Sequence, residues 1–126
     1  MREDTATGKK DDFFGPEPRG FINYGPDGRM IAIITRSGRS APATGNATPD
    51  EAVGLFKSML SYAGTYSVDG NEVTHHVDIP WNESFTGSEQ KRIATFAGNR
   101  LMLSTPPSLD PVDGKMSVRT MTWEKV

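Results

Sequence analysis

The chain has 126 residues, of which 35% are hydrophobic and 24% charged, and this is enough for one domain with its own core but too short for two. Fourteen basic and sixteen acidic residues give a net charge of -2, and no run of lysine or arginine could follow a phosphate backbone, so we expect no nucleic-acid partner. The absence of cysteine excludes disulfides, thiolate chemistry and cysteine-ligated metal sites.

The first segment, residues 1–12, is charged and is predicted to be a flexible arm, with the domain occupying residues 13–126. It lacks the apolar centre of a signal peptide, and no apolar run approaches the roughly 20 residues that span a bilayer. Together with the lack of cysteine, this predicts a cytoplasmic protein without a membrane partner.

The first strand pair is predicted at residues 20–25 and 29–36, which are rich in β-branched and aromatic side chains. Pro26, Asp27 and Gly28 between them form a typical turn sequence. A loop of small residues at 38–47 follows and could be a rim loop or a lid.

A single helix is predicted at about residues 49–60. Thr48 is a capping residue, Pro49 stands at the first helical position, and Glu51 lies three residues after the cap. Apolar residues then recur at helical spacing, so one face of this helix is expected to pack on an apolar surface.

From residue 62 onward the hydrophobic period changes from helical to alternating. Strands are predicted at residues 62–68, 72–79, 90–96, 100–105 and 115–126, with tight turns inside two hairpins. Seven strands and one helix, without alternating helices, favour an all-β antiparallel meander. We expect it to close into a barrel of about seven to eight strands, because closure removes exposed edges and can leave room for one small ligand.

Strand alternation predicts which side chains face the interior. Tyr62, Tyr66 and Val68 share one face, as do Val73, His75, Val77 and Ile79 on the next strand, and Arg92, Ala94 and Phe96 on another, opposite Leu101 and Leu103. Other aromatic and methionine side chains could line the cavity mouth but are equally typical of core: Tyr24, Met30, Phe56, Met59, Trp81 and Phe85. The predicted ligand-binding residues are Tyr24, Tyr62, Tyr66, His75, Trp81, Arg92 and Phe96.

Arg92 gives the most specific prediction of ligand chemistry, because an arginine inside a small barrel must be paired or hydrogen-bonded. One partner could be the carboxylate of an acyl-like ligand, held by the bidentate guanidinium. The alternatives are a structural ion pair with Glu72, Asp78 or Glu89, or an exposed side chain.

The sequence gives little evidence for a metal site, a cofactor site or a catalytic site. His75 and His76 are adjacent, so on a strand they face opposite sides and cannot share a metal, and we predict no metal site. The chain has no glycine-rich phosphate loop and no G-x-S-x-G motif, so we predict no cofactor and no hydrolase of that type. Acid–base catalysis by His75 with Tyr62 or Tyr66 remains open, and no catalytic residue is assigned.

Several segments, taken together and in order, resemble the bacterial lipocalin-like domain family. They are YGPDGRM at 24–30, TPDEA at 48–52, YAGTYSVDGNEVTHHV at 62–77, Gln90 with Arg92, GNRLMLSTPP at 98–107 and TWEKV at 122–126. The resemblance implies a small calycin-type antiparallel barrel with a helix near one mouth, mostly without assigned function. Members usually begin with a strand resembling G-T-W-x-L-V-S, which this chain lacks. Either one strand is absent or the barrel closes differently, and an unfilled edge beside Met121 and Trp123 would favour a homodimer or strand exchange.

Two functional interpretations stay open. The first is a binding module whose barrel holds a small hydrophobic or amphipathic molecule, with Arg92, His75 and a tyrosine as polar anchors. The alternative is a small barrel enzyme, an isomerase or cyclase using His/Tyr acid–base chemistry on a polyketide- or terpenoid-like substrate. A filled, purely structural barrel would contain no cavity.

Overall fold

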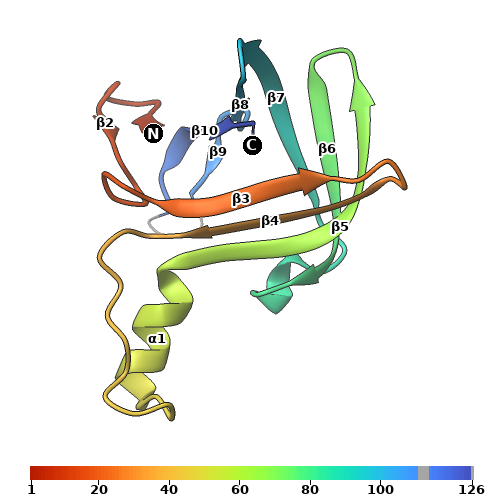
Figure 1. Cartoon of the computed structure of the whole chain (residues 1–126). Helices are drawn as coiled ribbons and strands as arrows, with labels where there is room; N and C mark the ends of the chain where they lie inside the picture. The colour runs from red at the N-terminus through yellow and green to blue at the C-terminus, as the bar shows by residue number, and fades with distance from the viewer. Residues whose placement is uncertain (111–113, 126) are drawn as a thin grey trace.

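The computed structural model describes residues 1–110 and 114–125 and consists of one antiparallel sheet and one α-helix (Figure 1). This confirms the predicted all-β antiparallel class. The long strands are β3 (Arg19–Tyr24), β4 (Arg29–Thr35), β5 (Met59–Asp69), β6 (Glu72–Pro80), β7 (Glu89–Ala97), β8 (Arg100–Ser104) and β10 (Met116–Glu124). Three short strands were not predicted: β1 (Arg2–Asp4), β2 (Lys10–Asp11) and β9 (Ser108–Leu109). The predicted last strand extended to Val126, which lies outside the described residues.

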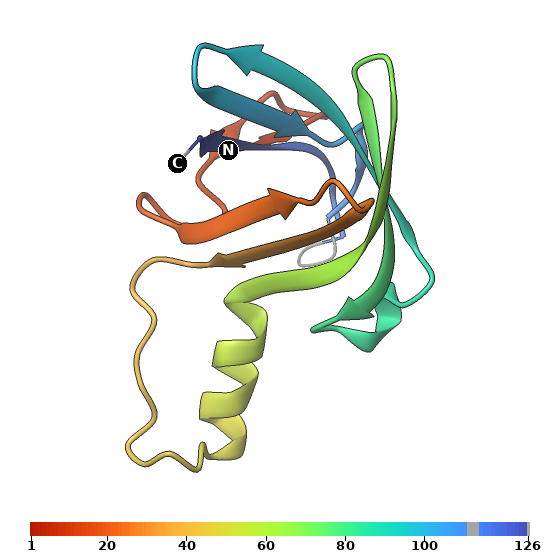
Figure 2. The ribbon, with the colours of Figure 1, turned by 45° about the vertical axis from the view of Figure 1, so that its right-hand side comes forward.

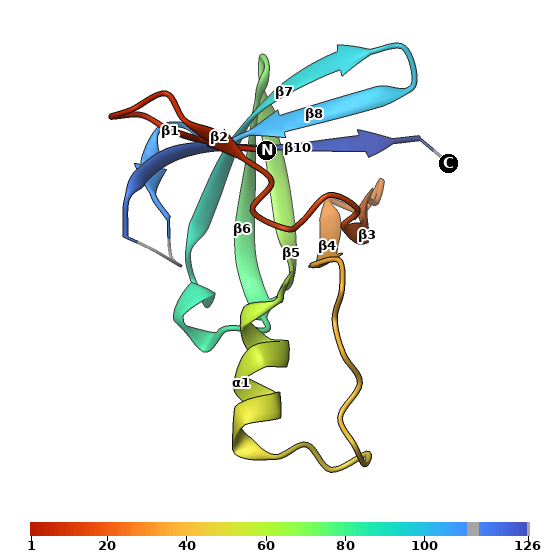
Figure 3. The same ribbon diagram turned by 90° about the vertical axis from the view of Figure 1, so that its left-hand side faces the viewer.

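The sheet coils around a concave interior but does not close, so the predicted closed barrel is wrong (Figures 2 and 3). Its strand order is β2-β1-β10-β8-β7-β6-β5-β4-β3, with β9 also paired to β10. Every neighbouring pair from β3 to β10 is antiparallel, and six such steps leave β3 and β10 running in the same direction. Among the described residues no strand lies between these two edges, and one running antiparallel to both would be needed to join them in an antiparallel barrel.

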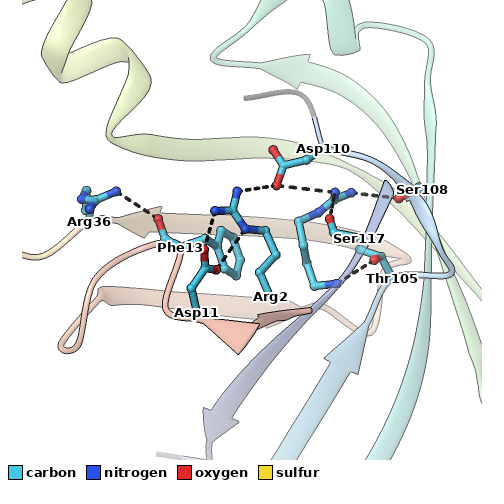
Figure 4. A network of polar contacts seen from close by, with 9 residues as sticks. Arg2, Asp11, Phe13, Arg36, Thr105, Ser108, Asp110 and Ser117 are labelled. Atoms are coloured by element: carbon cyan, nitrogen blue, oxygen red, sulfur yellow. Dashed lines mark hydrogen bonds and ion pairs between the residues drawn. The ribbon is translucent and has the colours of Figure 1, made fainter. Parts of the chain in front are cut away.

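The N-terminal segment is part of the sheet, although residues 1–12 were expected to form an arm. Arg2–Asp4 pair with Ser117–Arg119 of β10, so ordered pairing begins well before Phe13. The Arg2 guanidinium bonds to Asp11 at 2.6 Å and to Asp110 at 2.9 Å (Figure 4). The Asp110 side chain is almost fully buried, so the arginine compensates a carboxylate that burial would otherwise penalise. Such a long-range pair leaves no mark in local sequence pattern.

The helix α1 (Pro49–Lys57) begins as predicted, because Thr48 and Glu51 form a reciprocal capping box. It ends three residues earlier than expected: Ser58 caps it, and Met59 already pairs with Thr35 as the first residue of β5. The predicted packing of an apolar helix face is confirmed only in part, where the ring centroid of Phe56 lies 6.0 Å from that of Trp81. No residue of α1 is buried, Phe56 is 45% exposed, and the helix projects from the sheet (Figure 1).

A β-bulge in the β5–β6 ladder decides which residues face inward. Val77 pairs with Gly64 but Ile79 pairs with Ala63, so Asp78 is an extra residue on β6. The extra residue reverses the alternation beyond it. Val73, His75 and Val77 are therefore buried as predicted, whereas Ile79, predicted to share their face, is 66% exposed.

The core lies on the concave side of β3–β6. Its buried members are Met30, Ala32, Tyr62 and Val77, against which Ile22, Tyr24, Leu60, Tyr66 and Phe85 pack. Within residues 1–110 and 114–125, no helix has the length and apolar character needed to cross a membrane.

Candidate functional site

A cavity of about 470 Å³ lies toward the hairpin ends of β5–β6 and β7–β8. Its volume lies within the range of small-molecule sites. Apolar side chains dominate its lining, which consists of Tyr24, Tyr66, Val68, Gly70, Asn71, Val73, Ala94, Phe96, Leu101 and Leu103. Strand alternation predicted the inward rows from β5, β7 and β8, and these rows supply most of the wall.

Three polar side chains meet beside this cavity, and one of them, Tyr24, lines it. His75 is 1% exposed, and its Nε2 lies 2.6 Å from the hydroxyl oxygen of Tyr24, while its Nδ1 lies 2.7 Å from that of Tyr62. β3, β5 and β6 each contribute one member, and all three are among the residues predicted from sequence. Below we refer to Tyr24, His75 and Tyr62 as the Tyr–His–Tyr cluster.

Burial sets the protonation states of the cluster. Together with smaller electrostatic effects of Arg92 and His76, it lowers the pKa of His75 to about 4. Burial also raises the pKa of the Tyr24 and Tyr62 hydroxyls. At neutral pH the cluster therefore consists of two phenols and an uncharged imidazole.

Tyr66 belongs to the same cavity but not to the cluster. Its ring packs edge-on against Tyr24, with ring centroids 4.9 Å apart, and its hydroxyl donates to the carbonyl oxygen of Gly25 at 2.8 Å. The Tyr66 hydroxyl thus already has a backbone acceptor.

A second, smaller cavity of about 60 Å³ lies on the other side of the cluster. Tyr62, His75 and Arg92 line it together with apolar residues from β3, β4 and β10. Trp123 also lines it, and its buried indole N–H has no hydrogen-bond acceptor among the described residues.

Arg92 has none of the structural ion pairs that the sequence left open. Asp78 pairs with Arg29, and Glu89 lies 3.4 Å from His76. Within the described part of the chain, the Arg92 guanidinium bonds only to the carbonyl oxygen of Lys91, at 2.9 Å. Its charge nevertheless acts on all three members of the cluster, as the pKa effects on Tyr24, Tyr62 and His75 show.

Comparison with known proteins places this geometry in a family. The model of a lipocalin-like domain family matches residues 3–126, which is nearly the whole chain. The chain belongs to the lipocalin-like domain family. No curated protein and no solved structure matches it.

Two predicted site residues of this lipocalin-like domain lie away from the Tyr–His–Tyr cluster. Trp81 follows β6 at the opposite end from the large cavity, donates to the carbonyl oxygen of Phe56 and packs edge-on against Phe85, which lies in the short 3₁₀ helix η1 (Glu83–Phe85). Phe96 does line the large cavity but is 76% exposed, so it stands at the rim.

Some contributions to the cavities of the lipocalin-like domain were not predicted from strand alternation, including two from polar side chains. Asn71 reaches the large cavity from the β5–β6 turn, and Thr105 reaches the small one from the end of β8. Turn residues carry no alternation, so only the three-dimensional course of the hairpins reveals them. His76 faces the opposite side from His75, as predicted, and the described residues include no group of three or more that could hold a metal.

Proposed function

We propose that this lipocalin-like domain binds a small hydrophobic or amphipathic molecule in the large cavity on the concave side of its sheet. The observation that carries the proposal is a cavity of about 470 Å³ with apolar walls, whose lining includes Tyr24 of the polar cluster. Binding sites for small molecules combine these features, since apolar walls supply affinity and a few polar groups fix orientation. Membership of the lipocalin-like family supports the same role.

Filling the cavity tests the proposal. Ala94 lines it, whereas the next residue, Thr95, is exposed on the other face of β7. Ala94→Trp should occupy the cavity and weaken saturable binding of the fluorophore 1-anilinonaphthalene-8-sulfonate at least tenfold, while Thr95→Trp should leave it unchanged. Equal binding by wild type and Ala94→Trp would overturn the proposal.

Native mass spectrometry of the gently purified protein gives an independent check. Wild-type protein that carries a host molecule should show an added mass of small-molecule size that is lost on denaturation. The same added mass should be absent from Ala94→Trp and present in Thr95→Trp. An added mass that persists in Ala94→Trp would place the bound molecule elsewhere.

The enzyme alternative is not favoured by the contacts of His75. Both ring nitrogens are hydrogen-bonded to tyrosine, and a pKa of about 4 makes the imidazole a weak base near neutral pH. An isomerase or cyclase activity therefore stays a prediction from the sequence. The expected cytoplasmic location and the absence of a cofactor also remain predictions.

A further inference from the structure

The hydrogens of the Tyr–His–Tyr cluster do not all find acceptors within it. A neutral imidazole has one N–H, and each tyrosine has one O–H, which makes three hydrogens in total. Only two contacts join the three groups, Tyr24–His75 and Tyr62–His75, and each contact uses one hydrogen. Among the described residues neither hydroxyl has another acceptor. One phenolic hydrogen is therefore left over.

The imidazole tautomer decides which tyrosine holds that hydrogen. If Nδ1 carries the proton, His75 donates to Tyr62, Tyr24 donates to Nε2, and the hydrogen of Tyr62 is left over. If Nε2 carries the proton, the directions reverse and the hydrogen of Tyr24 is left over. The two arrangements share the same heavy-atom positions.

The two cavities make these arrangements unequal for a ligand. Tyr24 lines the cavity of about 470 Å³, whereas Tyr62 lines the one of about 60 Å³. The space beside Tyr24 is several times larger than the one beside Tyr62, so we take an organic molecule to approach the cluster from the side of Tyr24. Tyr66, the other hydroxyl of the large cavity, already donates to Gly25.

We propose that the molecule bound in the large cavity carries an oxygen acceptor, a carbonyl or a carboxylate, to which the Tyr24 hydroxyl donates while His75 adopts the Nε2–H tautomer. This inference rests on the proposed function and names the ligand chemistry that the site selects. Without such an oxygen, the extra phenolic hydrogen, on Tyr24 or on Tyr62, has no acceptor among the described residues, and an unsatisfied donor is costly. The positive charge of Arg92 near the cluster, without a carboxylate partner among the described residues, favours an oxygen that bears negative charge.

A matched set of probes separates these contributions. 2-Acetylnaphthalene and 2-ethylnaphthalene have nearly the same shape and differ in one carbonyl oxygen, and 2-naphthoate replaces the ketone with a carboxylate. We expect wild-type protein to bind the ketone roughly threefold to tenfold more tightly than the ethyl compound in calorimetric titrations. Tighter binding of the naphthoate than of the ketone would assign the carboxylate class, and the reverse order the carbonyl class.

Two tyrosine variants test whether the Tyr24 hydroxyl recognises this oxygen. Tyr24→Phe should abolish the preference for the ketone while binding of 2-ethylnaphthalene stays within about twofold. Tyr66→Phe, which removes a hydroxyl from the same cavity, should keep the preference. A preference that survives in Tyr24→Phe, or its absence in wild type while the ethyl compound still binds, overturns the inference but not the proposed function. If none of the probes binds, both fail.

The tautomer of His75 can be read without any substitution. In ¹⁵N NMR spectra at neutral pH, the two ring nitrogens of a neutral histidine report which one carries hydrogen. Saturation with 2-acetylnaphthalene should shift His75 toward Nε2–H, and saturation with 2-ethylnaphthalene should not. The same tautomer population with both probes would overturn the coupling.

Discussion

The hydroxyl oxygen of Tyr62 lies 2.7 Å from Nδ1 of His75, inside a part of the core where the imidazole is 1% exposed. This contact and the matching one from Tyr24 satisfy both ring nitrogens of a side chain that would otherwise be costly to bury. The cost of charging that imidazole is not offset, because no described carboxylate contacts it and Arg92 lies nearby. Protonation of His75 therefore opposes folding.

Stability should consequently fall as the pH is lowered from 6.5 to 4. The pKa of His75 is about 4 in the folded protein and 6.5 in its ordinary environment, so between these values the unfolded chain binds the extra proton. The contribution of the uncharged His75 to the free energy of unfolding is present in full above pH 6.5. It is lost as the pH falls from 6.5 through 4, by on the order of 3 kcal/mol. Urea unfolding at several pH values measures it.

The control for this pH dependence is His76→Gln, since His76 lies on the exposed face. This variant should keep the loss of stability between pH 6.5 and 4. Ion pairs with Arg2 and Arg29 lower the pKa values of Asp11 and Asp78 from 3.8, so these carboxylates titrate below this window. A flat stability profile from pH 6.5 to 4 in wild type would contradict the buried neutral imidazole.

Removal of the Arg92 charge should raise the pKa of His75. Burial is the larger cause of the low pKa and persists in Arg92→Gln, so the new value should stay below 6.5. Titration of the His75 ring protons by NMR measures the change. The control is Arg100→Gln. It removes an exposed arginine of β8 that pairs with Glu124 of β10, and it should leave the pKa of His75 unaltered. An unchanged pKa in Arg92→Gln would show that the guanidinium does not act on the cluster.

Alternation alone was enough to place His75, Tyr62 and Tyr66 on the inner face of the sheet, because the side-chain period of a strand is fixed by its backbone. Alternation failed to place Ile79, because the bulge inserts Asp78 as one extra residue. Nothing in the residue type of Asp78 identifies it as a bulge residue. Closure of the sheet depends on how two distant edges meet, and the pairing of Arg2 with Asp110 spans most of the chain. Neither is a local property. The helix start was predictable because a capping box is local, but whether its apolar face finds a surface is not.

Gly64→Ala should destabilise the fold by about 2 kcal/mol or more. A Cβ at Gly64 would clash with the carbonyl oxygen of His76, and backbone atoms at the bulge cannot yield as a flexible side chain would. Gly54→Ala is the matched control, because nothing lies within 4 Å of its Cβ position on α1 and alanine favours helix by up to about 1 kcal/mol. In urea unfolding, the two substitutions should therefore change the free energy of unfolding in opposite directions. If Gly64→Ala leaves this free energy unchanged, the close backbone approach at the bulge is contradicted.

Thr48→Ala should loosen α1 without unfolding the sheet. The substitution removes the hydroxyl that accepts from the Glu51 N–H, and such a cap contributes about 1 kcal/mol to helix stability. Because no residue of α1 is buried, the helix can open locally. Its amides should exchange hydrogen roughly fivefold faster, while those of β4 and β5 keep their rates. Thr48→Ser retains the hydroxyl and should exchange like wild type, and uniform acceleration across the sheet would show that the helix does not open by itself.

The open edges of the sheet predict concentration-dependent self-association through β10. Within the described residues no strand pairs with the outer edge of Thr122–Glu124, and unpaired edges of this kind recruit strands of other chains. The backbone N–H of Thr105 donates to the carbonyl oxygen of Arg119, and the N–H of Lys125 donates to the carbonyl oxygen of Asn99. The N–H of Lys125 therefore points toward β8. Because N–H groups point alternately to the two sides of a strand, the N–H of Thr122 points outward. Thr122→Pro therefore removes an edge donor without breaking the ladder, and sedimentation should show less dimer than in wild type or in Thr122→Val. A wild-type protein that stays monomeric at high concentration, or a proline variant that associates equally, would contradict this use of the edge.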